Sequence, residues 1–162
     1  FADGPGTGKR VDWPIDTIIR AAKNAGVTNQ IKSIDGAIGY IEYGYAVREG
    51  LAVASLENKA GRYVAPSLES GVAAFASVPA LPDNLRVWLP DPEGSRSYPC
   101  VTFTWLLCYK NYDSPQKAAT MRDLLAYCLT EGQRCSGEMG YIPLPENVVD
   151  TVMAAIENIQ PM

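Results

Sequence analysis

The chain of 162 residues is 47% apolar and 20% charged, a composition typical of an ordered globular protein of about one domain. Its formal net charge is −4 and its lysines and arginines are scattered, which argues against a surface that follows the phosphates of a nucleic acid. The sequence contains no histidine, which excludes Ser-His-Asp and Cys-His catalysis and the usual zinc sites. An enzyme that uses carboxylates stays open at this point, but no G-x-S-x-G or S-x-x-K motif occurs, and we predict no enzyme, no metal site and no cofactor.

The glycine-rich stretch "DGPGTGKR", residues 3–10, looks like a phosphate-binding loop but lacks the side chains that such a loop needs. If Gly8 and Lys9 formed the Gly-Lys pair of a Walker A motif, the leading glycine would fall on Asp3, whose charge repels phosphate. The hydroxyl that binds magnesium would fall on Arg10. The stretch therefore predicts a turn that leads into a short strand over residues 10–13.

Residues 15–34 contain two overlapping helical patterns, and both stay open at this point. The first covers residues 15–26, with apolar residues at helical spacing and Gly26 after its end. The second begins at Asn24 as a cap and places Val27, Ile31 and Ile34 on one side. A short buried strand over residues 37–41 is predicted next, because a glycine-flanked apolar run occurs there.

The middle of the chain predicts a short helix or turn, a hairpin and a capped helix. The helix or turn is closed by Gly50, and the hairpin has its turn at residues 58–61 and its return strand at residues 62–65. Three tyrosines in the preceding segment could line a cleft, but packing in the core is the favoured interpretation (Tyr40, Tyr43 and Tyr45). Ser67 then caps a helix that runs to about residue 78.

Five prolines make residues 79–99 the least regular region and the best candidate for a linker, with one short strand at residues 85–89. The strongest strand prediction follows in "CVTFTWLLCYK", residues 100–110, which is rich in β-branched and aromatic residues. The strongest helix prediction comes next, with Ser114 as N-cap, Pro115 as first residue and Gly132 beyond the end. A last helix is predicted over residues 146–159, and the alternation of strands with helices indicates an α/β protein.

The chain has four cysteines, at positions 100, 108, 128 and 135, and none of them forms a C-x-x-C motif. Cys100 and Cys108 lie too far apart along one predicted strand to reach each other. A disulfide would need another pairing, such as Cys128 with Cys135 across a helix end, whereas buried thiols are an equally good interpretation.

Several longer motifs resemble the substrate-binding protein of the bacterial ABC phosphate transporter. They are "GAIGYIEYGYA" at residues 36–46, "SYPCVTFTWLLCYKN" at residues 97–111 and "GYIPLPENVV" at residues 140–149. The resemblance covers nearly the whole chain in collinear order. "YCLTEGQ" and "GYIPLPENVV" are most similar to cyanobacterial versions of the family.

The resemblance implies part of a two-lobe periplasmic binding protein of type II, with mixed sheets flanked by helices. It implies that this chain is the C-terminal half, in which residues 1–97 belong to lobe 2. Residues 98–162 then supply the crossing strand and the C-terminal helices that complete lobe 1. The hinge candidates are Ser97, Tyr98 and Pro99, and the family's phosphate ligands lie upstream of Phe1, so no phosphate-binding residue is assigned.

The function implied by the resemblance is the capture of inorganic phosphate for an ABC importer, in the periplasm or on the outer face of the cytoplasmic membrane. The implied partners are phosphate, the ABC permease subunits, and the missing N-terminal half or a second copy of the chain, but no nucleic acid. The alternative is a truncated homologue that acts as a protein-interaction module without a ligand.

Overall fold

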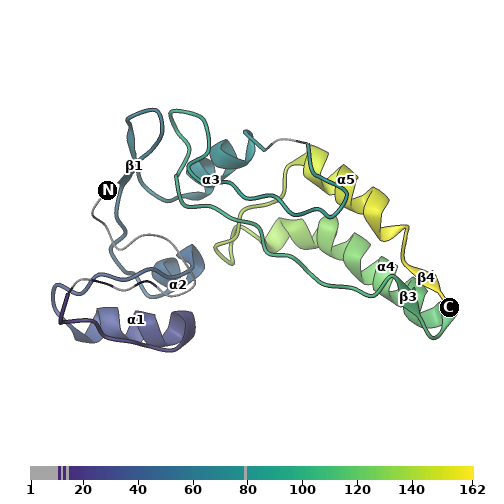
Figure 1. Cartoon of the computed structure of the whole chain (residues 1–162), viewed down its shortest axis with the longest axis horizontal. Helices are drawn as coiled ribbons and strands as arrows, with labels where there is room; N and C mark the ends of the chain where they lie inside the picture. The colour runs from purple at the N-terminus through teal and green to yellow at the C-terminus, as the bar shows by residue number, and fades with distance from the viewer. Residues whose placement is uncertain (1–10, 12, 14, 79) are drawn as a thin grey trace. The chain divides into compact units, whose positions relative to one another are not determined.

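A computed structural model of the chain describes residues 11, 13, 15–78 and 80–162 and divides the chain into two compact units, Phe1–Leu51 and Ala52–Met162 (Figure 1). This division falls after Leu51, whereas the lobe boundary predicted from the resemblance falls after residue 97. The lobe assignment itself stays a prediction. The predicted strand over residues 10–13 and the glycine-rich stretch before it lie largely outside the described residues.

In the first unit, the second of the two overlapping helical patterns forms. Helix α1 spans Lys23–Ser33 and helix α2 spans Tyr43–Arg48, followed by Gly50 at a φ of 62°. An ion pair of 2.6 Å joins Lys32 to Glu49 and connects the end of α1 to the end of α2. Residues 15–22 form no helix, so the first of the two predicted alternatives, a helix over residues 15–26, is wrong.

The strand predicted over residues 37–41 also does not form. A Cβ added at Gly39 would lie 2.9 Å from a methyl carbon of Val27, so this segment lies against α1 at very close range. No described strand lies beside residues 37–41 to hydrogen-bond with them, and a strand needs such a partner.

The second unit begins with the predicted hairpin and capped helix. Strand β1, Leu56–Glu57, pairs antiparallel with strand β2, Tyr63–Val64, so that Leu56 lies opposite Val64. Helix α3, Leu68–Phe75, starts at Ser67, whose hydroxyl accepts a hydrogen bond from the Ser70 N–H at 3.1 Å. These predictions are confirmed because each rests on a local signal, a tight turn or a cap.

The two strands predicted at residues 85–89 and 100–110 are not present as strands in the described structure. A single antiparallel bridge between Pro90 and Cys100 is the only pairing recorded for this part of the described chain. Trp105 instead donates a hydrogen bond from its indole N–H to the Leu85 carbonyl at 2.9 Å, and its ring lies beside Trp88. Residues 100–110 have the composition of a strand, but apart from this bridge no described segment pairs with residues 100–109.

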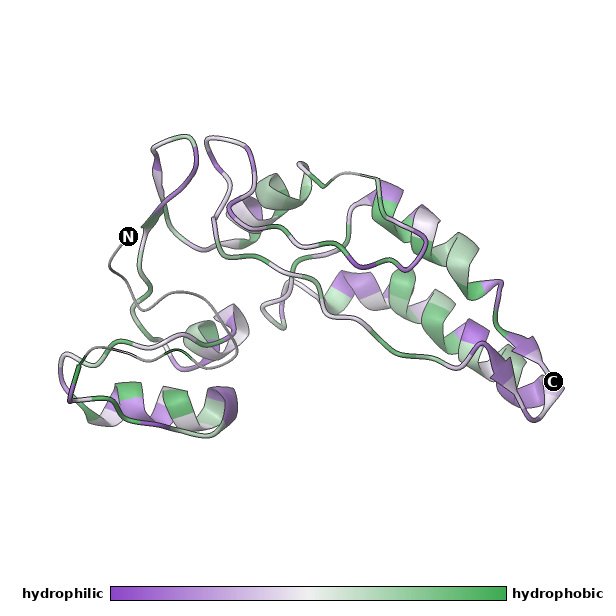
Figure 2. Cartoon of the chain, viewed as in Figure 1, coloured by the Kyte–Doolittle hydropathy of each residue, from purple (hydrophilic) through white to green (hydrophobic). Residues whose placement is uncertain are grey.

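The C-terminal part contains the hydrophobic core of the second unit. Helix α4, Pro115–Leu129, is followed by a 3₁₀ helix η1, Glu131–Cys135, and by helix α5, Glu146–Ile156. Strand β3, Asn111–Tyr112, pairs in parallel with strand β4, Gln160–Pro161. The core consists of buried Ala118, Ile156 and Ile159, and Figure 2 shows the apolar residues that α4 and α5 contribute. The predicted α/β class and both C-terminal helices are confirmed.

Among the described residues, no helix combines the length and the apolar character that crossing a membrane would require.

Candidate functional site

The hinge candidates lie in a segment that is hydrogen-bonded to the rest of the second unit. Ser97 is fully buried, and its hydroxyl donates to the Glu93 carbonyl at 2.6 Å. The Tyr98 N–H donates to the Ser70 carbonyl in α3 at 3.2 Å. Partial burial, and secondarily the charge of Cys100, raise the pKa of the Tyr98 hydroxyl. This segment is therefore anchored on both sides, and a hinge role for Ser97, Tyr98 and Pro99 stays a prediction.

Asn58, the first residue of the hairpin turn, is the centre of this polar junction. Its side chain is nearly completely buried, and the amide nitrogen lies 3.2, 3.3 and 3.0 Å from the carbonyl oxygens of Gly94, Ser95 and Ser97. Its Oδ1 accepts the N–H groups of two hairpin residues, Ala60 and Arg62, both at 3.1 Å. One buried amide therefore closes the turn and ties it to residues 94–97. We refer to Asn58 and residues 94–97 as the Asn58 junction.

Lys59 makes two exposed contacts beside the Asn58 junction. The Lys59 N–H donates to the Asp91 carboxylate at 3.0 Å, and the Lys59 ammonium forms an ion pair with Glu93. The Glu93 carboxylate raises the pKa of Lys59, chiefly through this hydrogen bond. Because both side chains are exposed, the ion pair contributes little to stability, and the buried amide of Asn58 dominates.

Sequence reasoning identified Asn58 only as the start of a turn. The available signal was an asparagine three residues before Gly61, which is typical of a hairpin turn. Its bonds to residues 94–97 connect positions 36 to 39 residues apart, and no local pattern encodes such a distance.

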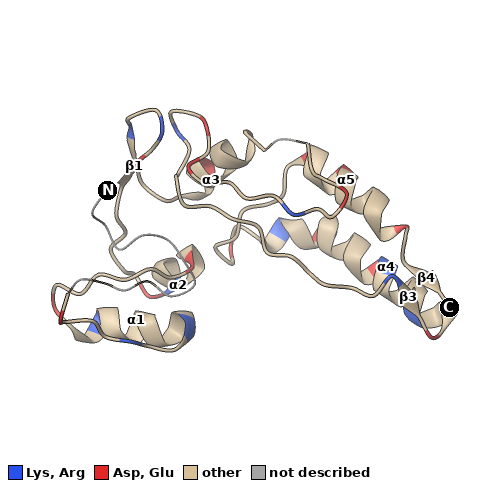
Figure 3. Ribbon diagram, in the orientation of Figure 1, with Lys and Arg blue, Asp and Glu red and all other residues tan. Residues whose placement is uncertain are grey.

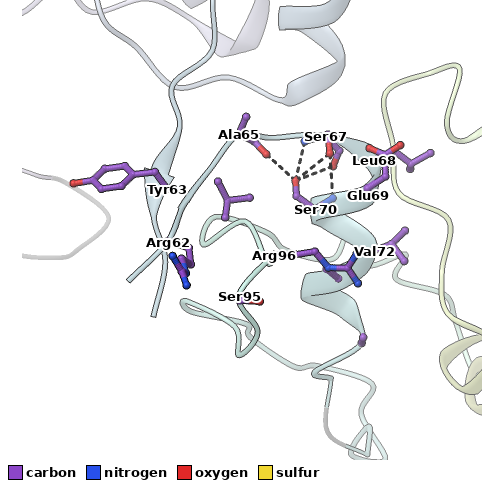
Figure 4. A pocket seen from close by; sticks show the side chains of 13 residues that line it. Arg62, Tyr63, Ala65, Ser67, Leu68, Glu69, Ser70, Val72, Ser95 and Arg96 are labelled. Atoms are coloured by element: carbon purple, nitrogen blue, oxygen red, sulfur yellow. Dashed lines mark hydrogen bonds between the residues drawn. The ribbon is translucent and has the colours of Figure 1, made fainter. Parts of the chain in front are cut away.

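A cavity of about 900 Å³ lies between the hairpin, the start of α3 and residues 95–96 (Figure 4). Arg62 and Arg96 line it, and neither forms an ion pair with another described residue. Glu69 also lines the cavity, and hydrogen bonds from its own N–H and from the Ser67 hydroxyl lower its pKa. The first turn of α3 is thus capped by side chains of the chain itself, rather than left open for a bound anion.

A second cavity, of about 480 Å³, lies within the first unit and is lined by Lys23, Asn24, Val27, Tyr40 and Tyr45, among others. The side-chain oxygen Oδ1 of Asn24 accepts a hydrogen bond from the Glu42 N–H at 3.2 Å, which connects α1 to the residue that precedes α2. The prediction that Tyr40 packs in the core is wrong, because its side chain is 88% exposed. Tyr45 is half-buried and lies under the Arg48 guanidinium, 4.7 Å from the ring centre.

All four cysteines are free thiols. The disulfide suggested between Cys128 and Cys135 does not form. The other interpretation, buried thiols, is wrong for Cys100, Cys108 and Cys135, which are exposed, whereas Cys128 is partly shielded. In the described part of the chain, no group of three or more acidic or cysteine side chains could hold a metal ion. Figure 3 shows lysine and arginine interspersed with aspartate and glutamate along the chain.

Comparison with known proteins places this geometry in a family context. No protein-family model matches the chain. A phosphate-binding protein PstS from Methanocaldococcus jannaschii is 38% identical over 99% of this chain. Proteins of the same name from Pasteurella multocida and Haemophilus influenzae are 36% and 32% identical over 92% and 91% of the chain.

The chain spans less than half of the length of these curated relatives, namely 45%, 43% and 44% of them. The predicted likeness to cyanobacterial versions stays a prediction. The identity extends from one end of the chain to the other, so the resemblance to phosphate-binding proteins is confirmed for the whole chain. It covers less than half of the length of each of these relatives. The 162 residues therefore correspond to part of a phosphate-binding protein of the PstS family.

Proposed function

We propose that the chain is part of a protein that captures inorganic phosphate for an ABC importer and that catalyses no reaction. The observation that carries this proposal is identity of up to 38% over 99% of the chain with proteins named for phosphate binding. The net charge of −4 is compatible with it, since an anion can be held by backbone N–H groups and hydroxyls in a closed cleft.

In this proposal the chain is the C-terminal half, and the phosphate ligands are supplied by polypeptide that precedes Phe1. More than half of each relative lies outside the match, which leaves room for these ligands. The protein acts in the periplasm or on the outer face of the cytoplasmic membrane, and it delivers phosphate to the ABC permease subunits.

We further propose that residues 98–162 complete the first lobe, as the resemblance implies. Two contacts support including residues 52–97 in the same lobe. The Phe75 ring in α3 stacks on Phe103 at a centroid distance of 4.6 Å, and Gly71 in α3 lies directly against Ile142. The lobe boundary would then follow Leu51 instead of residue 97.

A lobe boundary after Leu51 would also move the hinge. Ser97, Tyr98 and Pro99 are the candidates from the resemblance, but Ser97 is fully buried in the Asn58 junction. Residues 52–55 are exposed and lie outside any helix or strand. A hinge at residues 50–55 therefore needs to break fewer hydrogen bonds than a hinge at residues 97–99.

The test is a chimaera in which this chain replaces the matching segment of the Methanocaldococcus jannaschii protein, examined by isothermal titration. We expect the chimaera to bind phosphate with a Kd in the micromolar range or tighter and to reject sulfate, while the chain alone gives no heat. A folded chimaera that binds no phosphate would contradict the proposal. Phosphate binding by the chain alone would contradict the placement of the ligands upstream of Phe1.

The alternative is a homologue without a ligand that acts as an interaction module. The exposed apolar side chains of residues 106–109 are the observation that favours it. Stable association with a permease subunit by a folded chimaera that fails to bind phosphate would support this alternative.

A further inference from the structure

Helix α3 carries apolar residues on two of its faces. Ala74 and Phe75 are buried in the second unit. Leu68 and Val72, with Ala76 directly after the helix, follow one another at intervals of four positions and therefore form one row, and all three are exposed. We refer to Leu68, Val72 and Ala76 as the apolar row of α3. The outer face of a helix that packs on a protein is ordinarily polar, so an apolar row indicates a surface that another segment covers.

The apolar row lines the cavity of about 900 Å³, which lies entirely within the second unit (Figure 4). Tyr63 of the hairpin also lines it and is 74% exposed. Tyrosine and arginine are enriched at protein–protein interfaces, and the cavity offers Arg62 and Arg96 beside this tyrosine. The lining therefore has the composition of an interface.

The two arginines reach the cavity from different segments, and the Asn58 junction fixes the main chain of both. The Arg62 N–H donates a hydrogen bond to Oδ1 of Asn58 at 3.1 Å. The amide nitrogen of Asn58 lies 3.3 and 3.0 Å from the carbonyl oxygens of Ser95 and Ser97, the two neighbours of Arg96. The main chain at both arginines is thus held in place before any ligand binds, which lowers the entropy cost of binding.

Both guanidinium groups lack an acidic partner among the described residues. The acidic residues that precede Arg96 most closely in the chain, Asp91 and Glu93, contact Lys59 instead. Neither Arg62 nor Arg96 takes part in any of the ion pairs of the described chain. Each guanidinium group carries five N–H donors, so the cavity has donors for more than one carboxylate.

The start of α3 does not favour a small inorganic anion in this cavity. The Ser67 hydroxyl already accepts the Ser70 N–H. The Glu69 carboxylate, whose pKa is lowered by hydrogen bonds from its own N–H and from the Ser67 hydroxyl, places a negative charge at the same turn. An inorganic anion would also leave the apolar row uncovered.

A short acidic and apolar peptide satisfies both parts of the cavity. The apolar row is about 12 Å long, because eight helical positions rise by about 1.5 Å each. An extended peptide covers this length with about four residues. Its apolar side chains can cover the row, and its carboxylates can bind the guanidinium groups through paired hydrogen bonds.

We propose that the cavity between the hairpin, α3 and residues 95–96 is a docking surface for an extended segment of a partner protein, in which acidic residues alternate with apolar ones. Arg62 and Arg96 bind the carboxylates, and the apolar row of α3 takes up the apolar side chains. The proposal goes beyond the capture of phosphate and does not depend on it.

Fluorescence anisotropy with a synthetic peptide tests this proposal. The probe is a labelled tetrapeptide, blocked at both ends, in which two glutamates alternate with two leucines, and a reference peptide has glutamine in place of glutamate. We expect the glutamate peptide to bind the chain, and the chimaera described above, at least about 5-fold more tightly than the reference peptide. High salt should reduce this difference. Equal affinities of the two peptides, or binding of neither, would overturn the proposal.

Matched variants locate the surface. Arg62→Gln combined with Arg96→Gln should abolish the preference for the glutamate peptide, whereas Arg86→Gln, at an exposed position outside the cavity, should retain it. Val72→Ser should weaken the binding of both peptides, whereas Val53→Ser, at a position 44% exposed outside the cavity, should weaken neither. Equal effects of a cavity variant and its control would refute the assignment of the surface.

Two further measurements identify other occupants. If inorganic pyrophosphate displaced the peptide and bound as tightly as the peptide does, the arginines would serve a small anion instead. Peptide binding to the chain alone, but not to a folded chimaera, would mean that polypeptide of the same protein covers the cavity. Either result would contradict a docking surface for a partner.

Isothermal titration of the chimaera with phosphate separates failure of this inference from failure of the proposed function. Peptide binding without phosphate binding contradicts the proposed function alone, and phosphate binding without peptide binding contradicts the docking surface alone.

Discussion

The side-chain amide of Asn58 donates a hydrogen bond to the main-chain carbonyl of Ser97 at 3.0 Å, across 39 positions of the chain. Both residues are buried, so water does not replace this bond if it is lost. Gly94 completes the junction, because it adopts a φ of 113° and a Cβ there would lie 2.7 Å from the Ser97 hydroxyl. The hairpin and residues 94–97 are consequently held as one piece.

Asn58→Asp is expected to destabilise the second unit by about 2–4 kcal/mol, as measured by urea unfolding. The aspartate keeps the oxygen that accepts the N–H groups of Ala60 and Arg62 but replaces the amide donor with an oxygen that faces three carbonyls. Asn84→Asp is the control, since the Asn84 side chain is exposed and acts only as an acceptor for Arg86. If the two substitutions changed the free energy of unfolding equally, the Asn58 junction would not be a source of stability.

Gly71→Ala and Gly26→Ala form a matched pair with opposite expected signs, because both glycines are the fourth residue of their helices. A Cβ at Gly26 would meet its nearest atom at an ordinary 3.4 Å, so alanine should stabilise α1 by about 0.5–1 kcal/mol. A Cβ at Gly71 would lie 2.3 Å from Ile142, and overpacking should destabilise α3 by about 1–3 kcal/mol. Hydrogen exchange of α1 and α3 measures each effect separately.

The contact between Gly71 and Ile142 also predicts a rescue. Ile142→Ala removes the atoms that an added Cβ would meet. The double variant Gly71→Ala, Ile142→Ala should be more stable than the sum of the two single effects predicts, by at least about 0.5 kcal/mol. Additive effects would mean that α3 and residues 140–145 do not pack as described.

The elements that the sequence predicted correctly are those with a local physical signal. Ser114 accepts the Lys117 N–H and Pro115 occupies the first position of α4, as the cap pattern predicted. Ser67 starts α3 for the same reason. Such signals act within one helical turn, so the sequence records them directly.

The features that were missed depend on groups far apart in the chain. Residues 100–110 have strong strand propensity, but a strand exists only beside a partner, and no described residue pairs with residues 101–109. The Asn58 junction joins a hairpin turn to residues 94–97. The helix over residues 15–26 was an alternative of similar local quality, and the close approach of Gly39 to Val27 favours the helix that formed.

Acidification is expected to weaken the start of α4. A hydrogen bond from Lys117 at 2.8 Å is the main cause of the lowered pKa of Asp113, and the Lys117 charge adds to it. A carboxyl group whose pKa is lowered in the folded state stabilises the fold at pH values above its ordinary pKa of 3.8. This stabilisation is lost as the pH falls through the lowered pKa. The pKa of Asp113, measured by NMR, should rise towards its ordinary value in Lys117→Gln. Because both side chains are exposed, high salt should reproduce part of this change, whereas an unchanged pKa in the variant would exclude the ion pair as its cause.

Alkylation under non-reducing conditions is expected to modify all four cysteines, because all four are free thiols. Cys100, Cys108 and Cys135 are exposed and should react first, whereas Cys128 is partly shielded on α4 and should react several-fold more slowly. Its modification should become as fast as that of the others in urea, since unfolding removes the shielding. Intact mass before and after reduction distinguishes this outcome from a disulfide. A chain that takes up only two labels until it is reduced contains one disulfide, and peptide mapping would then show whether Cys128 and Cys135 form it.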